Sequence, residues 1–377
     1  MPGTRALTRT DRVSAVVDLD AVAANTRLIR ETSGTPVMAV VKADGFGHGL
    51  LPVARAALEG GAAWLGVTTL DEALELRYAG LPAPVLSWLH LPDEDFATAI
   101  GEGVDLGVST VEHLRSIVAA TGDAPARVHL KIDTGLSRNG AVADSWGELV
   151  DEAWRYETAG AVHVRGVWSH LHTAEEPETV PEQVRRFELA LARANRAGLR
   201  PTVRHLANSA AALTIPATRY DLVRAGIALY GVEPAHPGLR PAMTLRARAV
   251  QVKRVPAGTG VSYGHDHVTS RATTLVLVPL GFADGVPRLA GAHGAQVWFR
   301  GARHPVVGRI AMDQFVVDVG DTPAHVGDEI VLFGPGDEGE PTAVDWARWA
   351  GTNPHEILTG IGPRVPRHHH RSEGALP

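Results

Sequence analysis

The stretch VVKADGFGHGL, residues 40–50, joins the end of an apolar run to a glycine-rich turn. The run, residues 37–41, leads directly into Lys42, and three glycines then alternate with Phe46 and His48. A lysine is rarely fully buried without a partner, because removing its charge from water is costly in free energy. The stretch therefore indicates either a strand end at the surface or a place where the amine takes part in chemistry.

Outward from this stretch, short strand-like runs alternate with helical patterns. Strands that alternate with helices pair in parallel. Eight such units over about 250 residues predict an α/β fold of the (β/α)8 TIM-barrel type, with a doubly wound sheet as the alternative. The strands are expected at residues 37–44, 64–69, 83–89, 105–109, 126–135, 162–171, 202–209 and 222–231.

The pattern changes after about residue 241, where β-rich runs are broken by glycine and proline. This pattern predicts a second, mainly antiparallel β-domain, interrupted by one helix at residues 343–351. The expected organisation is a barrel over residues 12–241, a C-terminal β-domain over 242–367 and a flexible tail over 368–377.

Composition excludes several classes of protein. Of the 377 residues, 45% are hydrophobic and 21% are charged, as in ordinary globular proteins. The net charge of −6 argues against binding to nucleic acid or to an anionic membrane. The chain has no cysteine, which excludes disulfides, thiolate nucleophiles and cysteine metal sites. Neither a secretory signal nor a membrane-spanning run is visible, so a cytoplasmic location is expected.

Active sites of barrels lie at the C-terminal ends of the strands. The residues at those ends are polar, whereas the bodies of the strands are apolar. Carboxylates are scarce among them, so no metal site is expected. The polar residues at the predicted strand ends are Lys42, Lys131, Asp133, Arg138, Ser169, His170, His172, His205, Asn208, Ser209 and Arg224.

The loops at residues 208–210 and 225–227 are small and rich in backbone N–H donors. In barrels, the corresponding loops often hold a phosphate group. A strand-end lysine together with a phosphate site suggests pyridoxal 5′-phosphate. A Schiff base with this cofactor would remove the difficulty of burying Lys42, since the amine becomes an imine.

Each of these residues also has a purely structural interpretation. Lys42 could extend its ammonium group to solvent, and Lys131 could form an ion pair with Asp133 on the same strand face. His170 could be a hydrogen-bonded core residue, and Ser209 could cap a helix. Taken singly, none of them decides between structure and chemistry.

Taken together, the motifs over residues 12–367 resemble the alanine racemases. The resemblance implies a pyridoxal-phosphate barrel of fold-type III followed by a β-domain, assembled as a homodimer with shared active sites. It also implies an isomerase that interconverts L- and D-alanine and supplies D-alanine, a precursor of cell-wall peptidoglycan. The motifs are VVKADGFGHG, KIDTGLSRNG, HLANSAA, VRAGIALYG, GVSYG, GFADG, VGRIAMDQ and GPRVPR.

The resemblance implies two bases on opposite faces of the substrate Cα. Lys42 would carry the cofactor covalently and act on one face, and Tyr263 of the partner subunit would act on the other. His170 would lie against the cofactor ring and connect Tyr263 through Arg224 to His205. Arg224 would face the pyridine nitrogen and, because it does not readily lose its proton, would leave that nitrogen unprotonated.

The resemblance also assigns cofactor and substrate contacts. Ser209, Gly226 and Ile227 are implied to bind the phosphate, and Asn208 and Phe46 are implied to lie at the cofactor as well. The substrate carboxylate is implied to meet Arg138, which a CO2-modified, carbamylated Lys131 would orient. The backbone N–H of Met312 from the partner subunit would bind the same carboxylate, with Asp313 beside it.

The chain departs from the family pattern at four positions. Phe46, Phe282 and Pro363 stand where tyrosines are usual or frequent, and Ala311 stands where a cysteine is frequent. The changes at Phe46 and Pro363 predict weaker anchoring of the cofactor phosphate, since a lost hydrogen bond to a charged group is worth roughly 1.5–3 kcal/mol. Phe282 leaves open a different small substrate such as serine, used in a specialised pathway.

Three other functions are compatible with parts of the pattern. A decarboxylase of basic amino acids would share the architecture, but it would need a cysteine and an acidic partner for the pyridine nitrogen. A cofactor carrier would not need the second domain with Tyr263. A non-catalytic cofactor-binding paralogue stays open because of the missing tyrosines.

Overall fold

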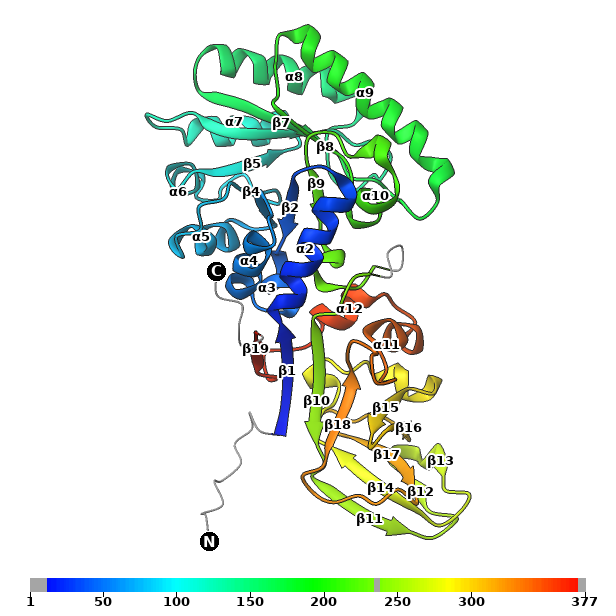
Figure 1. Cartoon of the computed structure of the whole chain (residues 1–377). Coiled ribbons are helices and arrows are strands. Elements are labelled where there is room, and N and C mark those ends of the chain that lie inside the picture. Colours follow the sequence, from blue (N-terminus) through cyan, green and yellow to red (C-terminus); the bar gives the residue numbers. More distant parts are fainter. Residues whose placement is uncertain (1–11, 234–237, 372–377) are drawn as a thin grey trace. The chain divides into compact units, whose positions relative to one another are not determined.

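The computed structural model describes residues 12–233 and 238–371, and the chain divides into two compact units (Figure 1). The barrel unit contains residues 22–45 and 50–239. The β-unit contains the segment before residue 22, residues 46–49 and the segment from residue 240 onward. Each unit has its own sheet.

The sheet of the barrel unit has eight strands, all parallel to their neighbours, and they run in the order β8-β7-β6-β5-β4-β3-β2-β9. Backbone hydrogen bonds from Asp221 N to Arg204 O and from Arg224 N to Ala207 O link the two ends of this order. The prediction of a (β/α)8 barrel is therefore confirmed. The strands are β2 (Val37–Val40), β3 (Trp64–Val67), β4 (Val85–Ser87), β5 (Val104–Val108), β6 (Ala126–Lys131), β7 (Val162–Trp168), β8 (Val203–His205) and β9 (Val223–Ala225).

The barrel strands are short apolar runs that are buried on both faces, as is typical of parallel sheets. Met38, Trp64, Leu86 and Leu222 pack together in this core. Helices follow the strands, and several begin at side-chain caps such as Thr69, which forms a capping box with Glu72. These helices are α2 (Leu19–Ser33), α4 (Leu50–Glu59), α5 (Leu70–Tyr78), α6 (Phe96–Gly101), α7 (Val111–Ala119), α8 (Ala143–Thr158), α9 (Val180–Ala197) and α10 (Ser209–Thr214), with short turns η1 (Pro177–Thr179), η2 (Pro216–Thr218) and η3 (Ile227–Tyr230).

The segment after β2 differs from the expected strand at residues 37–44. The strand ends at Val40, and Lys42 begins the short helical segment α3 (Lys42–Gly47). Its backbone is left-handed, with positive φ at consecutive residues. For residues other than glycine this conformation costs roughly 1–2 kcal/mol each. The values are 53° for Ala43, 52° for Asp44, 60° for Gly45, 53° for Phe46 and 78° for Gly47.

Neighbouring groups hold this strained turn in place. Ala43 N donates to the Glu72 carboxylate at 2.6 Å, and Leu50 N donates to the Asp44 carboxylate at 2.7 Å. Gly45 N donates to Val41 O at 2.8 Å and closes the turn. Strain of this kind persists only where surrounding contacts determine the conformation, and it is frequent at functional sites. The backbone of Lys42 therefore sits at the start of a tightly specified turn.

The β-unit contains a nine-stranded sheet in the order β11-β14-β17-β16-β15-β18-β10-β1-β19 and a separate β12–β13 ribbon. Every pairing in the large sheet is antiparallel except that of β1 with β19, so the expected antiparallel domain is confirmed. The strands are β1 (Val13–Asp18), β10 (Met243–Arg248), β11 (Gln251–Val255), β12 (Gly260–Val261), β13 (His267–Val268), β14 (Thr273–Val278), β15 (Gln296–Phe299), β16 (Ala302–Val307), β17 (Phe315–Gly320), β18 (Glu329–Phe333) and β19 (Arg367–His370).

Two of the expected domain boundaries differ from those in the structure. The segment at residues 13–18 was expected in the barrel, but β1 pairs with β10 of the β-unit. Residues 368–370 were expected in a flexible tail, but they pair with β1 in β19. Local pattern does not reveal either pairing, because each partner strand lies hundreds of residues away. Arg371 follows β19, and residues 372–377 of the expected tail lie outside the described residues.

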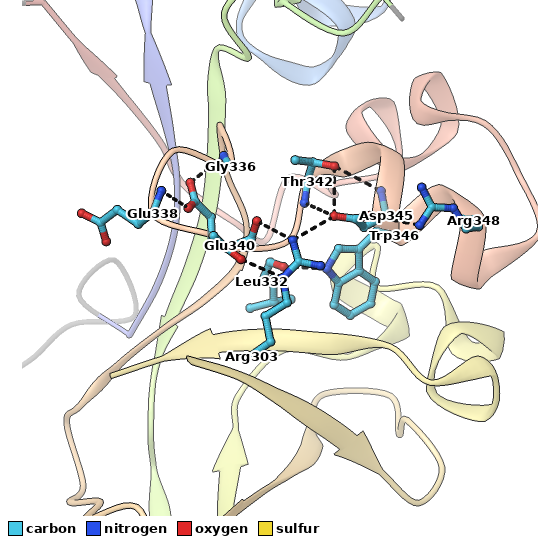
Figure 2. A network of polar contacts seen from close by, with 10 residues as sticks. Arg303, Leu332, Gly336, Glu338, Glu340, Thr342, Asp345, Trp346 and Arg348 are labelled. Atoms are coloured by element: carbon cyan, nitrogen blue, oxygen red, sulfur yellow. Dashed lines mark hydrogen bonds and ion pairs between the residues drawn. The ribbon is translucent and has the colours of Figure 1, made fainter. Parts of the chain in front are cut away.

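Short helices complete the β-unit, and a polar network fixes the start of one of them (Figure 2). The buried Glu340 carboxylate accepts N–H groups from Gly336 at 2.7 Å and Glu338 at 3.0 Å. Arg303 donates to Glu340 O at 3.1 Å and to the carboxylate of Asp345 at 3.3 Å. The helical elements are α11 (Ala343–Ala350), α12 (Pro354–Thr359), η4 (Tyr263–His265), η5 (Phe282–Asp284) and η6 (Arg288–His293).

Within the residues that the structure describes, no helix is both long enough and apolar enough to cross a bilayer. The cytoplasmic location stays a prediction.

Candidate active site

Five basic side chains gather at the C-terminal ends of the barrel strands. Lys131 ends β6, and Arg224 lies in β9. Lys42 follows β2, Arg138 follows β6 and His170 follows β7. Their charges act on one another: the pKa of Lys131 is lowered by Arg224, Arg138 and Lys42, and the pKa of His170 by the same three groups together with Lys131. The structure thus brings together five of the basic residues that the sequence indicated at the strand ends.

Lys42 is half-buried, and burial is the largest cause that lowers its pKa. The nearby positive charge of Arg138 lowers the pKa further, while the carboxylate of Glu72 opposes the shift. A lowered pKa increases the fraction of the amine that is neutral at a given pH. At neutral pH, a larger share of Lys42 than of a lysine in water is therefore unprotonated and ready to act as a nucleophile or proton acceptor.

Lys131 is buried, with 4% of its surface exposed, and burial together with Arg224 and Arg138 lowers its pKa to about 7. Its Nζ lies 4.2 Å from the ring centroid of Trp168. An amine with this pKa is substantially neutral at physiological pH. The positive charges of Arg224, Arg138 and Lys42 act on it together, opposed by the carboxylate of Asp133, and this excess of cations favours an anion at the same place.

Lys131 and Asp133 do not form the ion pair that the structural interpretation of the sequence suggested. The carboxylate of Asp133 instead accepts backbone N–H groups from Gly135 at 2.8 Å and from Ser137 at 3.0 Å. These bonds shape the loop that carries Arg138. Asp133 therefore organises the loop, and its charge acts on Lys131 only as a cause that opposes the lowering of the lysine pKa.

Arg224 is a buried hub of hydrogen bonds. Its Nη2 donates to Ser169 O at 2.7 Å, to Leu206 O at 3.0 Å and to His170 Nδ1 at 3.2 Å. Its Nη1 donates to His205 O at 2.9 Å and to His205 Nδ1 at 3.1 Å. Within the described residues, its Nε makes no hydrogen bond. Burial lowers the pKa of Arg224 only to about 9, so the guanidinium remains charged at neutral pH.

Both histidines bound to Arg224 are neutral. Burial lowers the pKa of His170 and of His205 well below the ordinary value, and the charge of Arg224 is the second cause for each. Since Arg224 can only donate, Nδ1 of each ring accepts a bond and the single proton lies on Nε2. His170 thus carries its N–H on the ring side that Arg224 does not occupy.

The two small loops expected at the phosphate lie together. Ser209 Oγ accepts N–H groups from Gly226 at 2.9 Å and from Ala228 at 3.3 Å, so the first turn of α10 is joined to the start of η3. Asn208 caps α10 through Ala211 N at 3.1 Å. The residues of this cluster fit a phosphate group, because Ser209 Oγ accepts two N–H groups and still has its own O–H to donate to an anion.

The expected partner-subunit residues Tyr263 and Met312 lie in the β-unit and are exposed, with exposed fractions of 69% and 56%. Phe282, one of the departures from the family pattern, is 42% exposed in the same unit. The loops interlock, because Phe282 N donates to Ala311 O at 3.1 Å and Ala283 N to Met312 O at 3.0 Å. Asp313 forms an ion pair with Arg364 at 2.5 Å.

Phe46, at one departure from the family pattern, is buried in the β-unit, and its ring centroid lies 5.9 Å from that of His355. The following turn is anchored by Arg367, whose Nε donates to Gly47 O at 2.9 Å. A Cβ at Gly47 would lie 2.7 Å from Leu358 O, so this position requires glycine. Whether the lost hydroxyl at Phe46 weakens phosphate anchoring stays a prediction.

Sequence reasoning missed two buried polar residues, Asp105 in β5 and His129 in β6. His129 Nδ1 lies 2.9 Å from His205 Nε2, and His129 Nε2 lies 3.1 Å from the Asp105 carboxylate. Attention to strand ends passed over them because both lie within strands. A charged or imidazole side chain inside an otherwise apolar strand was the signal that could have revealed them.

Comparisons with known proteins agree with this architecture. Models of the alanine racemase N-terminal and C-terminal domains match residues 17–234 and 242–369. An alanine racemase of Frankia casuarinae is 53% identical over 369 residues, which are 94% of this chain and 96% of that protein.

Solved structures give the same result. The alanine racemase of D-cycloserine-producing Streptomyces lavendulae has a TM-score of 0.93 and 49% identity, with coverage of 95% of this chain and 97% of that one. The Streptomyces coelicolor A3(2) enzyme also has a TM-score of 0.93, with 48% identity and coverage of 96% and 98%. A serine racemase, a decarboxylase, a carrier or a non-catalytic paralogue is not favoured by these matches. The chain belongs to the alanine racemase family.

Proposed function

We propose that this chain is a pyridoxal-phosphate-dependent isomerase that interconverts L- and D-alanine by proton transfer at both faces of Cα. The observation that carries the proposal is the gathering of Lys42, Lys131, Arg138, His170 and Arg224 around the strand ends of one barrel. The alanine racemases to which the chain is similar support the choice of substrate.

The residues present fit the cofactor. Lys42 offers an amine of lowered pKa, the hydroxyl of Ser209 offers a donor for a phosphate, and Arg224 keeps Nε available to a pyridine nitrogen. When bound, pyridoxal phosphate supplies the electron sink that makes the Cα proton of an amino acid acidic. Arg224 limits that sink, because a guanidinium does not give its proton to the ring nitrogen.

Proton transfer would be divided between two side chains. Lys42, half-buried and beside Arg138, has a larger neutral fraction than a lysine in water, so more of it is ready to take a proton from the Cα on its own face. Tyr263 would serve the opposite face, with His170 Nε2–H in reach of its oxygen. A hydrogen-bond donor at that oxygen stabilises the phenolate, which helps a phenol act as a base near neutral pH.

We propose further that Tyr263 reaches the site of a second copy of this chain in a homodimer. The exposure of Tyr263, Phe282 and Met312 on interlocked loops supports this, because a cluster of exposed apolar groups marks an interaction surface. In that arrangement Met312 N–H and Arg138 would bind the substrate carboxylate, and Asp313, held by Arg364, would lie beside them.

The reaction is tested by supplying a panel of L-amino acids and separating the enantiomers produced. L-Alanine and D-alanine are each expected to reach an equal mixture, because the two enantiomers have the same free energy in water. Faster turnover of serine than of alanine, or no turnover of either by the cofactor-loaded protein, would overturn the proposal.

Lys131 is expected to react with CO2, forming an N–C bond with loss of one amine proton to give a carbamate anion. Its amine becomes mostly neutral as the pH rises above about 7, and Arg138 and Arg224 would stabilise the product. A carbamate signal is expected in the carbon NMR spectrum with labelled bicarbonate, and it should disappear in Lys131→Ala but persist in Lys253→Ala. A spectrum without that signal, or a signal unaffected by Lys131→Ala, would contradict the modification.

A further inference from the structure

Four buried side chains form a continuous hydrogen-bonded row inside the barrel unit. Arg224 Nη1 lies 3.1 Å from His205 Nδ1, His205 Nε2 lies 2.9 Å from His129 Nδ1, and His129 Nε2 lies 3.1 Å from Asp105 Oδ2. The exposed fraction is 4% for Arg224 and 0% for the other three. Arg224 and His205 belong to the site described above, whereas His129 and Asp105 extend the row away from it.

The Asp105 end of the row is fully compensated. Its carboxylate accepts from Arg127 Nε at 2.9 Å and from Arg165 Nη1 at 3.1 Å, besides its contact with His129. Both guanidinium groups are partly exposed, so they connect the buried charge to solvent. A carboxylate that receives donors on every side acts as a fixed acceptor.

The two ends of the row dictate the direction of each bond within it. Asp105 can only accept, so His129 carries its proton on Nε2 and presents a bare Nδ1 to His205. Arg224 can only donate, so His205 carries its proton on Nε2 and presents a bare Nδ1 to Arg224. Both requirements are met at once when each imidazole is neutral, and then every donor in the row faces an acceptor.

Neighbouring residues are arranged to make room for this row and to keep it dry. A Cβ at Gly166 would lie 2.2 Å from His129 Nδ1, although the backbone there has no positive φ that would itself require glycine. Trp168 stacks on the ring of His205, with centroids 5.4 Å apart, and Trp64 meets the edge of His129 at 5.4 Å. Hydrogen bonds are stronger in such a water-excluded place.

We propose that Asp105 and His129 are positioning residues for racemisation, because they hold His205 in the tautomer that receives Arg224 and so fix the guanidinium group that orients His170. The inference rests on the proposed function, in which His170 supports Tyr263 of the partner subunit. Asp105 and His129 touch neither substrate nor cofactor in this account.

Asp105→Asn is the sharpest probe of the row, because it preserves shape and replaces a carboxylate that can only accept with an amide that must also donate. An asparagine that donates to His129 Nε2 would force the proton of His129 onto Nδ1, where it would face the N–H of His205. An asparagine that accepts from His129 would direct its NH2 group toward Arg127 and Arg165. Either orientation places donor against donor.

Asp105→Asn and Gly166→Ala are each expected to lower kcat by about tenfold to 100-fold in the cofactor-loaded enzyme, as removal of supporting shells typically does. Exchange of the α-proton with heavy water should slow more for one enantiomer of alanine than for the other. Asp221→Asn is the matched control: it weakens a carboxylate–guanidinium pair with Arg204 that lies outside the row, and it should change kcat by about twofold at most. Full kcat in folded Asp105→Asn, or equal slowing for both enantiomers, would refute the positioning role.

Neutron diffraction from the unmodified holoenzyme tests the row without any substitution. Deuterons are expected on Nε2 of His129, His205 and His170, and none on their Nδ1 atoms. A deuteron on Nδ1 of His205 or His129 would overturn the inference even if both variants failed to fold. Failure of the proposed function is separate, since it would appear as a wild-type protein that does not racemise alanine.

Discussion

Lys42→Ala is expected to lower the rate of alanine racemisation by about 10³-fold or more, because it removes one proton-transfer group and the covalent attachment of the cofactor together. The visible absorbance of the holoenzyme that arises from this attachment should also be lost. Both readouts follow from the placement of Lys42 at the start of a strained turn, half-buried beside Arg138.

The chain provides an unusually clean control for this experiment. It contains three lysines, of which Lys42 and Lys131 lie at the candidate site and Lys253 lies exposed in β11. Lys253→Ala should retain both the absorbance and the activity. Borohydride reduction followed by peptide mapping then has only three possible attachment points, and a label on Lys131 or Lys253 would refute the role assigned to Lys42.

Tyr263→Phe should have the second largest effect, a loss of about 10²-fold to 10⁴-fold in kcat, because it deletes the acid–base group on one face of Cα. Exchange of the α-proton from the enantiomer that faces Tyr263 should slow far more than exchange from the other, which Lys42 still serves. The absorbance of the bound cofactor should stay unchanged, since Lys42 is untouched.

Tyr78→Phe is the matched control for that variant. Tyr78 is exposed by 67%, nearly the same as the 69% of Tyr263, but it lies on helix α5 of the barrel unit. Loss of its hydroxyl should leave the exchange of both enantiomers as in the wild type. Equal slowing of both enantiomers in Tyr263→Phe would mean that Tyr263 supports the fold of the site instead of one face of the reaction.

The sequence predicts the barrel well because its evidence is local. Several barrel strands are short apolar runs followed by a capped helix, as at β3 and α5, and such patterns need no knowledge of distant partners. The position of β1 is different, because the run at residues 13–18 is equally compatible with either sheet. Only its pairing with β10, more than two hundred residues later, decides the matter.

The residues of the candidate site also differ in how well the sequence predicts them. Lys42 and Arg224 are visible in sequence because a charge follows or interrupts an apolar run. The left-handed turn after Lys42 is not, since Ala43 and Asp44 rarely adopt positive φ and do so here through contacts with Glu72 and Leu50. The direction of the row from Asp105 to His205 depends on which nitrogen faces which atom, and that is a property of three dimensions alone.

A tagged heterodimer of Lys42→Ala and Tyr263→Phe subunits tests the shared site most directly. One of its two sites would contain both substitutions, and the other would contain an intact Lys42 opposite an intact Tyr263. We predict that the purified heterodimer has about half the activity of the wild-type dimer, although each variant alone is nearly inactive. An inactive heterodimer, or a chain that forms no dimer at all, would contradict the account.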